Sequence, residues 1–159
     1  MTRTDPGLRL ALALLTLFAV YAPPTIAQSH PVLTGRVIKV TDGDTIKVQL
    51  TSGPINVRFD SIDAPESHQP HGAQAKAALA KLVADRDVEL DVITQDRYER
   101  LVAVVYVGGV NVNEQLVKDG HAWAYRECLK NRNYCTWEDN ARTAKRAVWA
   151  LPTTSWIYA

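Results

Sequence analysis

Hydrophobic and polar residues alternate in three consecutive segments, Leu33–Val40, Asp44–Leu50 and Ile55–Phe59. This alternation places apolar side chains on one face and polar side chains on the other, as in a half-buried strand. The residues between the segments, Thr41-Asp42-Gly43 and Ser52-Gly53-Pro54, are typical of tight turns. The pattern therefore predicts an antiparallel meander of three strands.

The pattern changes to that of a helix after Pro65. Residues Ala73–Ala84 are rich in alanine, and Leu79, Leu82 and Val83 recur at helical spacing. We expect a helix with one apolar face that packs on the sheet.

Two longer strands are predicted next, at Arg86–Thr94 and Leu101–Val107, and Gly108-Gly109 turns the second into a short strand at Val110–Val112. A short helix over Asn113–Asp119 follows and ends at Gly120, a residue that favours the left-handed conformation.

Thr136 and Asp139 form a variant of the capping box, which predicts that a last helix begins there and runs to about Trp149. In total, the pattern gives five main strands and about three helices. We expect an α+β fold dominated by β, a five-stranded barrel of the OB-fold type, which leaves no exposed sheet edge and binds ligands at its loops.

The first 27 residues read as a cleavable signal peptide, and 28–159 as the folded domain. Arg3 and Arg9 precede the apolar run Leu10–Val20, and Thr25-Ile26-Ala27 offers small residues for cleavage. We expect a secreted or periplasmic protein that is not attached to a membrane. An uncleaved membrane anchor is the alternative.

Charge gives no sign of a broad basic surface. The chain has 18 basic and 17 acidic residues, and loss of residues 1–27 removes Arg3, Arg9 and Asp5, so the mature chain is formally neutral. Binding of nucleic acid through general electrostatic attraction requires a basic excess. A phosphate ligand would therefore have to be held by a few placed arginines and a metal ion.

The two cysteines, Cys128 and Cys135, lie in the exported part of the chain. In an oxidising compartment, such a pair predicts a disulfide that closes a small loop.

Asp44 and Asp63 are the best candidates for metal ligands, because each lies where a predicted strand begins or ends. Carboxylate oxygens suit calcium or magnesium. The alternative is that Asp42 and Asp44 are only turn residues of a hairpin, and that Asp63 is only a turn residue before Pro65.

Glu66 follows the rigid Pro65 and is placed to orient a water molecule as a general base. Arg58 and Arg100 can clamp a phosphate group and stabilise its transition state, whereas each alone reads equally well as a surface charge.

Tyr98 and Tyr125 are candidates for substrate binding through a base or a phosphate, with packing on the barrel as the alternative. His68 and His71 have a spacing that suggests zinc, but no third ligand accompanies them.

Three motifs resemble the staphylococcal nuclease (thermonuclease) family. They are Asp42-Gly43-Asp44-Thr45, Arg-x-x-x-Ile-Asp-Ala-Pro-Glu at 58–66 and Asp-Arg-Tyr-x-Arg at 96–100. The resemblance extends over about 33–150 and includes Gly-x-Ala-Trp-x-Tyr at 120–125.

The resemblance implies a role for each matching residue. Asp44 and Asp63 match calcium-binding aspartates, and Ala64 stands where the family supplies a backbone carbonyl ligand. Glu66 matches the proposed general base. In the same way, Arg58 and Arg100 match the catalytic arginines, and Tyr98 and Tyr125 match tyrosines that contact phosphate.

The implied reaction is calcium-dependent hydrolysis of DNA and RNA with little sequence specificity, which leaves 3′-phosphate ends. We expect a monomer without a stable protein partner. Glu99 replaces the usual glycine before Arg100 and would be strained if φ is positive there. Its charge could also pair with Arg100 and weaken the binding of phosphate. Asp60 replaces a glycine or apolar residue. Glu99, the neutral charge of the mature chain and the absence of lysines from the short loop at 67–72 support the alternative of a catalytically weak, nucleic-acid-binding OB-fold module.

Overall fold

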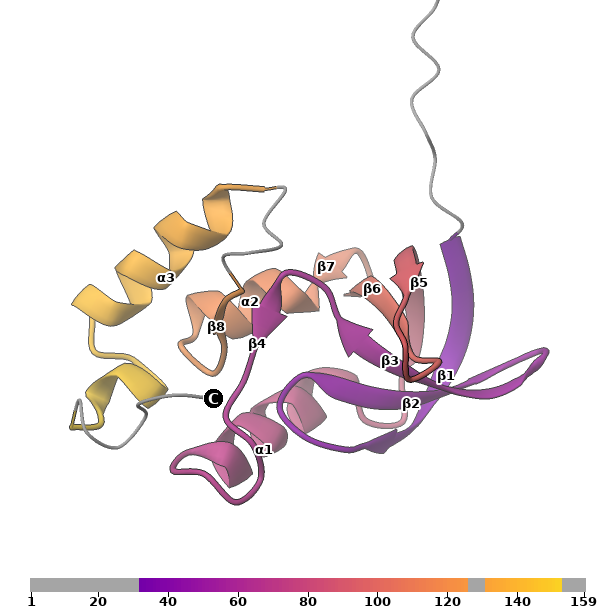
Figure 1. Ribbon diagram of the computed structural model, residues 1–159, viewed down its shortest axis with the longest axis horizontal. Coiled ribbons are helices and arrows are strands. Elements are labelled where there is room, and N and C mark those ends of the chain that lie inside the picture. Colours follow the sequence, from indigo (N-terminus) through magenta and orange to yellow (C-terminus); the bar gives the residue numbers. More distant parts are fainter. Residues whose placement is uncertain (1–31, 126–130, 153–159) are drawn as a thin grey trace, which may run out of the picture.

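A barrel forms one half of the protein, and helices α2 and α3 lie beside it (Figure 1). The computed structural model describes residues 32–125 and 131–152. In chain order, the elements are β1 (Val32–Val40), β2 (Thr45–Leu50), β3 (Gly53–Phe59), β4 (Ile62–Asp63), α1 (Gly72–Val83), β5 (Asp87–Gln95), β6 (Leu101–Val107), β7 (Val110–Asn111), α2 (Val112–Lys118), β8 (Trp123–Ala124), α3 (Asn133–Thr143) and the 3-10 helix η2 (Ala147–Ala150).

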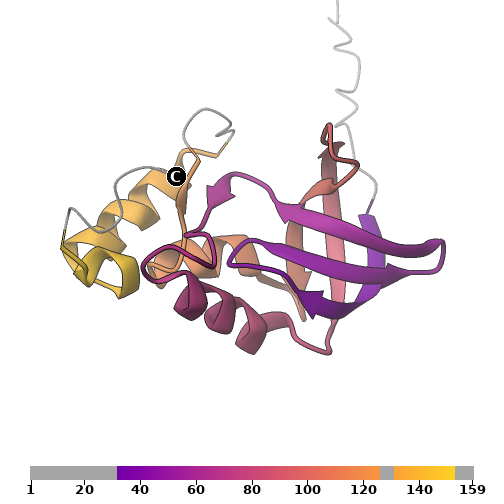
Figure 2. The ribbon, with the colours of Figure 1, turned by 60° about the horizontal axis from the view of Figure 1, so that its bottom comes forward.

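The sheet has the strand order β3-β2-β1-β5-β6-β7, and an additional pairing between β3 and β6 closes it (Figure 2). Neighbouring strands are antiparallel along this order, whereas the closing pair is parallel and aligns Arg58 with Val102. The predicted meander and the five-stranded OB-fold barrel of the α+β class are therefore confirmed.

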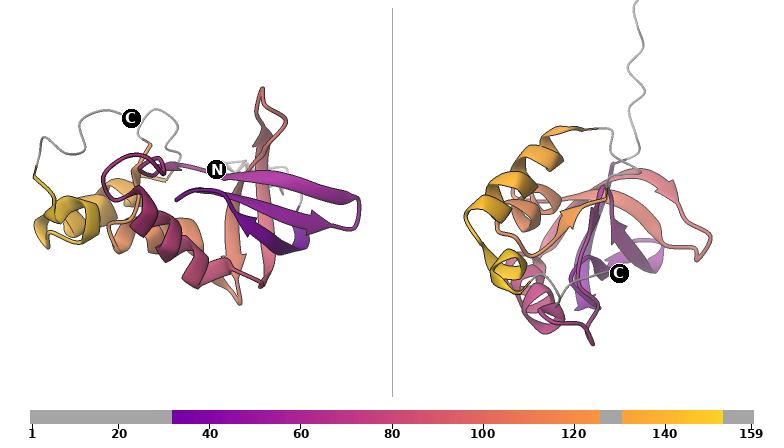
Figure 3. Two further views of the ribbon diagram at one scale, coloured as in Figure 1. Left: turned by 90° about the horizontal axis from the view of Figure 1, so that it is seen from below. Right: turned by 60° about the vertical axis from the view of Figure 1, so that its left-hand side comes forward.

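The barrel interior is filled by the alternating apolar positions, among them Val57 and Phe59 of β3, which are almost completely buried. The predicted apolar face of α1 joins the same core through Leu79 and Val83. Figure 3 shows α1 next to the barrel, on the side opposite the tip of the β2–β3 hairpin. Within the described residues, no helix is long and apolar enough to cross a membrane.

The last helix differs from the prediction at both ends. It begins at Asn133, so Thr136 lies inside it and the predicted capping box is wrong. It ends at Thr143, because Lys145 adopts a left-handed φ of 50° and the Arg146 N–H bonds to the Ala141 carbonyl at 3.0 Å. This hydrogen bond is typical of a Schellman motif, in which the left-handed residue after the helix is usually glycine. Here that residue is Lys145, so the sequence does not indicate the end of the helix.

The two-residue strands β4 and β8 pair with each other in a separate sheet and were not predicted. Residues 1–31 lie outside the described residues, as does Cys128. The signal peptide and the disulfide between Cys128 and Cys135 thus remain predictions.

Asn113 on α2 connects the helix layer to the barrel. Its side chain is fully buried, its Oδ1 accepts from the Val105 N–H at 2.9 Å and its Nδ2 donates to the Asp60 carbonyl at 2.9 Å. Buried backbone groups that lack partners are costly. Asn113 therefore fixes the loop after β3 against β6.

We expect Asn113→Ala to lower the free energy of unfolding by about 3 kcal/mol, because two buried backbone groups lose their partner. Urea denaturation measures this loss. The control is Asn140→Ala on the exposed side of α3, for which we expect little change. An equal effect of both variants would contradict the role of Asn113.

Candidate active site

The turn between β1 and β2 holds Asp44 in a buried position. Its side chain is only 2% exposed. The carboxylate accepts hydrogen bonds from the Thr45 hydroxyl at 3.0 Å and from the Ala64 N–H at 2.9 Å. Asp42 acts as a turn residue, since its Oδ1 accepts from the Asp44 N–H at 3.1 Å. The Asp44 carboxylate is thus fixed by both loops that the sequence singled out.

Gly43 allows this close approach of the two loops. A Cβ atom at Gly43 would lie 2.7 Å from Cβ of Ala64 and 2.9 Å from Cβ of Ala75. Neither neighbour is a flexible side chain, so any larger residue would separate the Asp44 turn from Ala64 and α1.

The guanidinium of Arg58 lies between two carboxylates. Nη1 donates to Asp44 and Nη2 donates to Asp63. Burial raises the pKa of Asp44 to about 8, although the charge of Arg58 opposes this shift and Asp42 and Asp63 add to it. The charged form of Asp44 therefore depends on a positive charge close to it.

The donor atoms of this site fit a hard divalent cation. Asp44 and Asp63 present oxygens from two neighbouring loops toward one positive charge. Calcium binds such carboxylates together with backbone carbonyls and water. No cluster of three or more His, Cys, Asp or Glu side chains suited to a metal is present in the described parts of the chain, so carbonyl and water ligands would have to complete the coordination.

Glu66 begins a tight turn that exposes its side chain to solvent. Gln69 closes the turn twice, because its N–H donates to the Glu66 carbonyl at 2.8 Å and its Oε1 accepts from the Glu66 N–H at 2.7 Å. A Cβ atom at Gly72 would lie 1.9 Å from the Glu66 carbonyl oxygen. Gln69 and Gly72, which sequence reasoning missed, therefore hold the backbone of Glu66.

Arg100 is positioned by the loop between β5 and β6. Its Nε donates to Asp96 at 2.8 Å, and Asp96 also accepts from the N–H groups of Tyr98 and Arg100. These hydrogen bonds outweigh the effect of desolvation and lower the pKa of Asp96. The guanidinium carbon of Arg100 lies 5.4 Å from the centroid of the exposed Tyr98 ring.

Glu99 adopts a φ of 63° in this loop, which confirms that the position requires the left-handed conformation. Arg100 forms its ion pair with Asp96, one turn away, and not with Glu99 as the sequence suggested. The strain at Glu99 is therefore real, and the nearest partner of Arg100 is a different carboxylate.

The closure of the barrel brings the two arginines together. Arg58 is aligned with Val102 in the parallel β3–β6 pair, and Arg100 precedes Val102 by two residues. Arg100 lies in the loop directly before β6, so this pairing brings the loop that carries Arg100 next to the strand that carries Arg58.

Tyr125 and Asp60 flank the short strand β4. The Tyr125 N–H donates to the Ser61 carbonyl at 2.9 Å, and the Tyr125 side chain is 43% exposed. The Asp60 carboxylate accepts from the Ser61 hydroxyl at 2.7 Å. Tyr125 is thus placed beside the strand that carries Asp63, whereas Asp60 has a local role.

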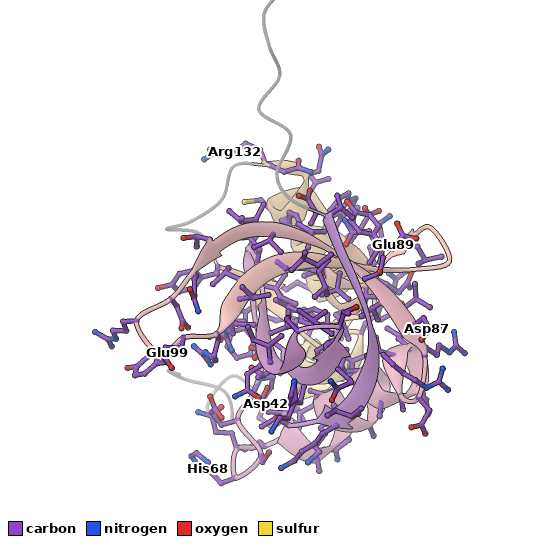
Figure 4. The ribbon with its side chains drawn as sticks, turned by 90° about the vertical axis from the view of Figure 1, so that its right-hand side faces the viewer. Asp42, His68, Asp87, Glu89, Glu99 and Arg132 are labelled. Atoms are coloured by element: carbon purple, nitrogen blue, oxygen red, sulfur yellow. The ribbon has the colours of Figure 1, made fainter. Side chains whose placement is uncertain are left out.

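Two turns of the candidate site lie away from the acidic residues of β5. Figure 4 shows His68 and Glu99 at the left of the view, Asp42 near its centre, and the β5 residues Asp87 and Glu89 at the right. The carboxylates of Asp87 and Glu89 thus lie away from the turns that carry His68 and Glu99.

His71 pairs with His121 rather than with His68, which argues against the zinc motif. His71 Nε2 lies 3.0 Å from His121 Nδ1. Partial burial lowers the pKa of both histidines. For His71, the charge of His121 lowers the pKa further. For His121, the charge of Asp119 opposes the decrease in pKa and that of Lys81 adds to it.

These two histidines border a groove of about 450 Å³ between α1 and α2. None of the candidate catalytic residues lines this groove. They lie instead on the β1–β2 turn, on β3 and β4, and on the loops that follow β4 and precede β6.

The chain is similar to known nucleases. Residues 56–151 match the family described as staphylococcal nuclease homologue. A protein of Haemophilus influenzae, named as an uncharacterized endonuclease, is 39% identical over 89% of this chain and 78% of its own length. A protein of Escherichia coli O157:H7 with the same name is 35% identical over 91% and 94%. The micrococcal nuclease of Shigella flexneri is 36% identical over 88% of each chain.

We expect Glu99→Gly to raise the free energy of unfolding by about 0.5–1 kcal/mol, because the left-handed strain exceeds the added backbone entropy of glycine. Glu99→Ala removes the charge but keeps the strain and serves as the control. Urea denaturation compares the two. If both variants are equally stabilised, the charge and not the backbone is responsible.

The histidine pair predicts a pH dependence of stability. Because both folded-state pKa values are lowered, the pair's contribution is present above the ordinary histidine value of about 6.5 and is lost as the pH falls below it. We expect His71→Gln/His121→Gln to reduce the fall in urea midpoint between pH 7.5 and pH 5. Exposed His68→Gln should keep the fall of the wild type. An unchanged fall in the double variant would refute this linkage.

Proposed function

The chain belongs to the staphylococcal nuclease family, and from this premise we propose that it is an exported, calcium-dependent nuclease that cleaves DNA and RNA with little sequence specificity. Family membership makes the protein a hydrolase that acts on the ester bonds of nucleic acids. Our proposal adds to this the identity of the metal ion, the substrates, the products and the location of the protein.

The observation that carries this proposal is the placement of Arg58 between Asp44 and Asp63, with the β5–β6 loop that carries Arg100 next to β3. Asp44, Asp63 and the carbonyl of Ala64 would hold calcium. When bound, calcium polarises the phosphate and supplies an activated water. The two carboxylates alone would repel a phosphate, so the cation is what allows an anionic substrate to approach.

Glu66 acts as the general base in this proposal. Its carboxylate is exposed on a turn that Gln69 closes at both the N–H and the carbonyl of Glu66. An exposed carboxylate on a rigid turn can accept a proton from a water molecule without moving far.

Arg58 and Arg100 stabilise the extra negative charge on the phosphorus in the transition state. Guanidinium groups remain charged and donate two parallel hydrogen bonds to phosphate oxygens. Arg100 must share its guanidinium between the substrate and Asp96, which holds its Nε. The remaining N–H groups of the fork are the ones that we assign to phosphate.

Tyr98 and Tyr125 bind the nucleic acid beside the reacting phosphate. Both rings are exposed, and exposed aromatic rings stack on any base, which suits low sequence specificity. The products carry 3′-phosphate ends, as the family resemblance implies.

Export rests on the signal-peptide pattern of residues 1–27, and it makes the protein secreted or periplasmic. An oxidising compartment would also allow Cys128 and Cys135 to form their disulfide. We propose a monomer whose partners are its substrates alone.

A catalytically weak binding module is the second candidate. It is favoured by the ion pair that holds Arg100 to Asp96 and by the strained Glu99 beside it. Arg58, Asp44, Asp63 and Glu66 are nevertheless all present, so we place the nuclease first.

Calcium dependence is tested with purified residues 28–159 and plasmid DNA. We expect degradation with calcium and none with a calcium chelator, because Asp44 and Asp63 cannot hold a phosphate without a cation. Magnesium, which tolerates fewer carbonyl ligands, should support less activity. Degradation at the same rate in the presence of the chelator would refute the calcium proposal.

We expect Arg58→Ala and Arg100→Ala each to lower kcat by about 10²-fold or more, since each removes a donor that acts in the transition state. Arg86→Ala is the matched control, because Arg86 is exposed on the approach to β5. Wild-type kcat in the Arg100 variant would remove that residue from the mechanism and favour the binding module.

A further inference from the structure

The strand β8 is too short to position itself. It has two residues, Trp123 and Ala124, and pairs only with the two-residue strand β4, in a sheet separate from the barrel. A ladder of this length has little stability of its own. Yet Asp63 belongs to this ladder, opposite Trp123, and Tyr125 follows it.

A buried carboxylate on α3 supports β8 from the side opposite β4. Glu138 is only 2% exposed, and its Oε2 accepts from the Ala124 N–H at 3.0 Å. Its Oε1 accepts from Arg142 Nη2 at 2.6 Å. A carboxylate that accepts from a buried backbone N–H forms a stronger bond than a neutral acceptor does.

This contact occupies the place that a third strand would have. The Ala124 N–H points to Glu138, while the neighbouring Tyr125 N–H points to Ser61 on the other side. Alternate N–H groups of a strand point in opposite directions. Glu138 therefore accepts a hydrogen bond from the edge of β8 that faces away from β4, and this contact holds β8 on β4.

We propose that Glu138 is a positioning residue for the nuclease site: through Ala124 it holds β8 on β4 and so sets the positions of Asp63 and Tyr125. This inference rests on the proposed function. Glu138 is not one of the candidate catalytic or metal-ligating residues, and the proposed effect passes through its hydrogen bond with the Ala124 N–H and through the pairing of β8 with β4.

The segment 120–125, which contains β8, is held at its first residue by a separate contact. The Gly120 carbonyl accepts from the Val148 N–H of η2 at 3.1 Å. If the Glu138 contact is lost, β8 should therefore become more mobile, whereas Gly120 should keep its position. Such a local effect differs from general destabilisation of the fold.

Three variants separate the bond, the charge and the ion pair. Glu138→Ala removes the acceptor for Ala124. Glu138→Gln keeps an acceptor oxygen but removes the charge. Arg142→Ala removes the partner of Oε1 and leaves the bond to Ala124, which makes it the matched control.

The first measurement is steady-state cleavage of an oligonucleotide with calcium, at a temperature where each variant is folded by circular dichroism. We expect kcat of Glu138→Ala to fall by about tenfold or more, because small displacements of reacting groups are costly. Glu138→Gln and Arg142→Ala should stay within about threefold of the wild type. If Glu138→Ala lowers only the melting temperature, or Glu138→Gln is as impaired as Glu138→Ala, the proposal is wrong.

The second measurement does not depend on activity. Amide hydrogen exchange should become faster in Glu138→Ala at 61–64 and 123–125 but not at 120, and should be unchanged at these positions in Arg142→Ala. Faster exchange at 123–125 alone would refute the link to Asp63. If Glu138→Ala does not fold, Glu138→Asp, which withdraws the carboxylate by one methylene, carries the same expectations. If the wild-type protein is inactive, the proposed function is refuted. The exchange data would still show whether Glu138 holds β8 and β4 in place.

Discussion

The ion pairs of Arg58 with Asp44 and Asp63 are the constraint on which the rest of the site depends. Two carboxylates that face one point repel each other, and burial makes the charge on Asp44 still more costly. The partly buried Arg58 between them offsets part of this cost in the protein alone. The same arrangement leaves the site ready for a second positive charge, since carboxylates held in place for a guanidinium are also held in place for a cation.

The residues around the site position its charged groups and do not themselves take part in the proposed reaction. Glycines at 43 and 72 remove side chains where the Asp44 turn and the Glu66 turn meet their neighbours. Asn113 fixes the loop that leads from β3 to Asp63. None of these residues carries a charge, yet each holds a loop that carries a charged group of the site. In this protein, packing and electrostatics therefore cannot be altered independently.

The barrel and most of the candidate site were predictable from sequence, because alternation, turn residues and three spaced motifs are local signals. The pattern pointed to Glu99 as a partner for Arg100, because Glu99 is its neighbour in sequence, whereas the loop brings Asp96 to the guanidinium. Other contacts depend on tertiary structure that no local pattern records. Glu138 reads as one more charge on a helix, and β4 with β8 is too short to show periodicity. The end of α3 was missed because Lys145 takes a conformation that usually requires glycine.

The parallel pairing of β3 with β6 has a consequence for the newly made chain. Arg58 and Arg100 are 42 positions apart in sequence, and the non-local pairing of β3 with β6 brings the loop that carries Arg100 next to the strand that carries Arg58. Contacts of such separation form late, because the intervening loop must first be closed. A chain that has folded only its meander therefore holds Arg58 without the loop that carries Arg100 beside it. Under the proposed function, the two arginines assigned to the phosphate come together only when the barrel closes.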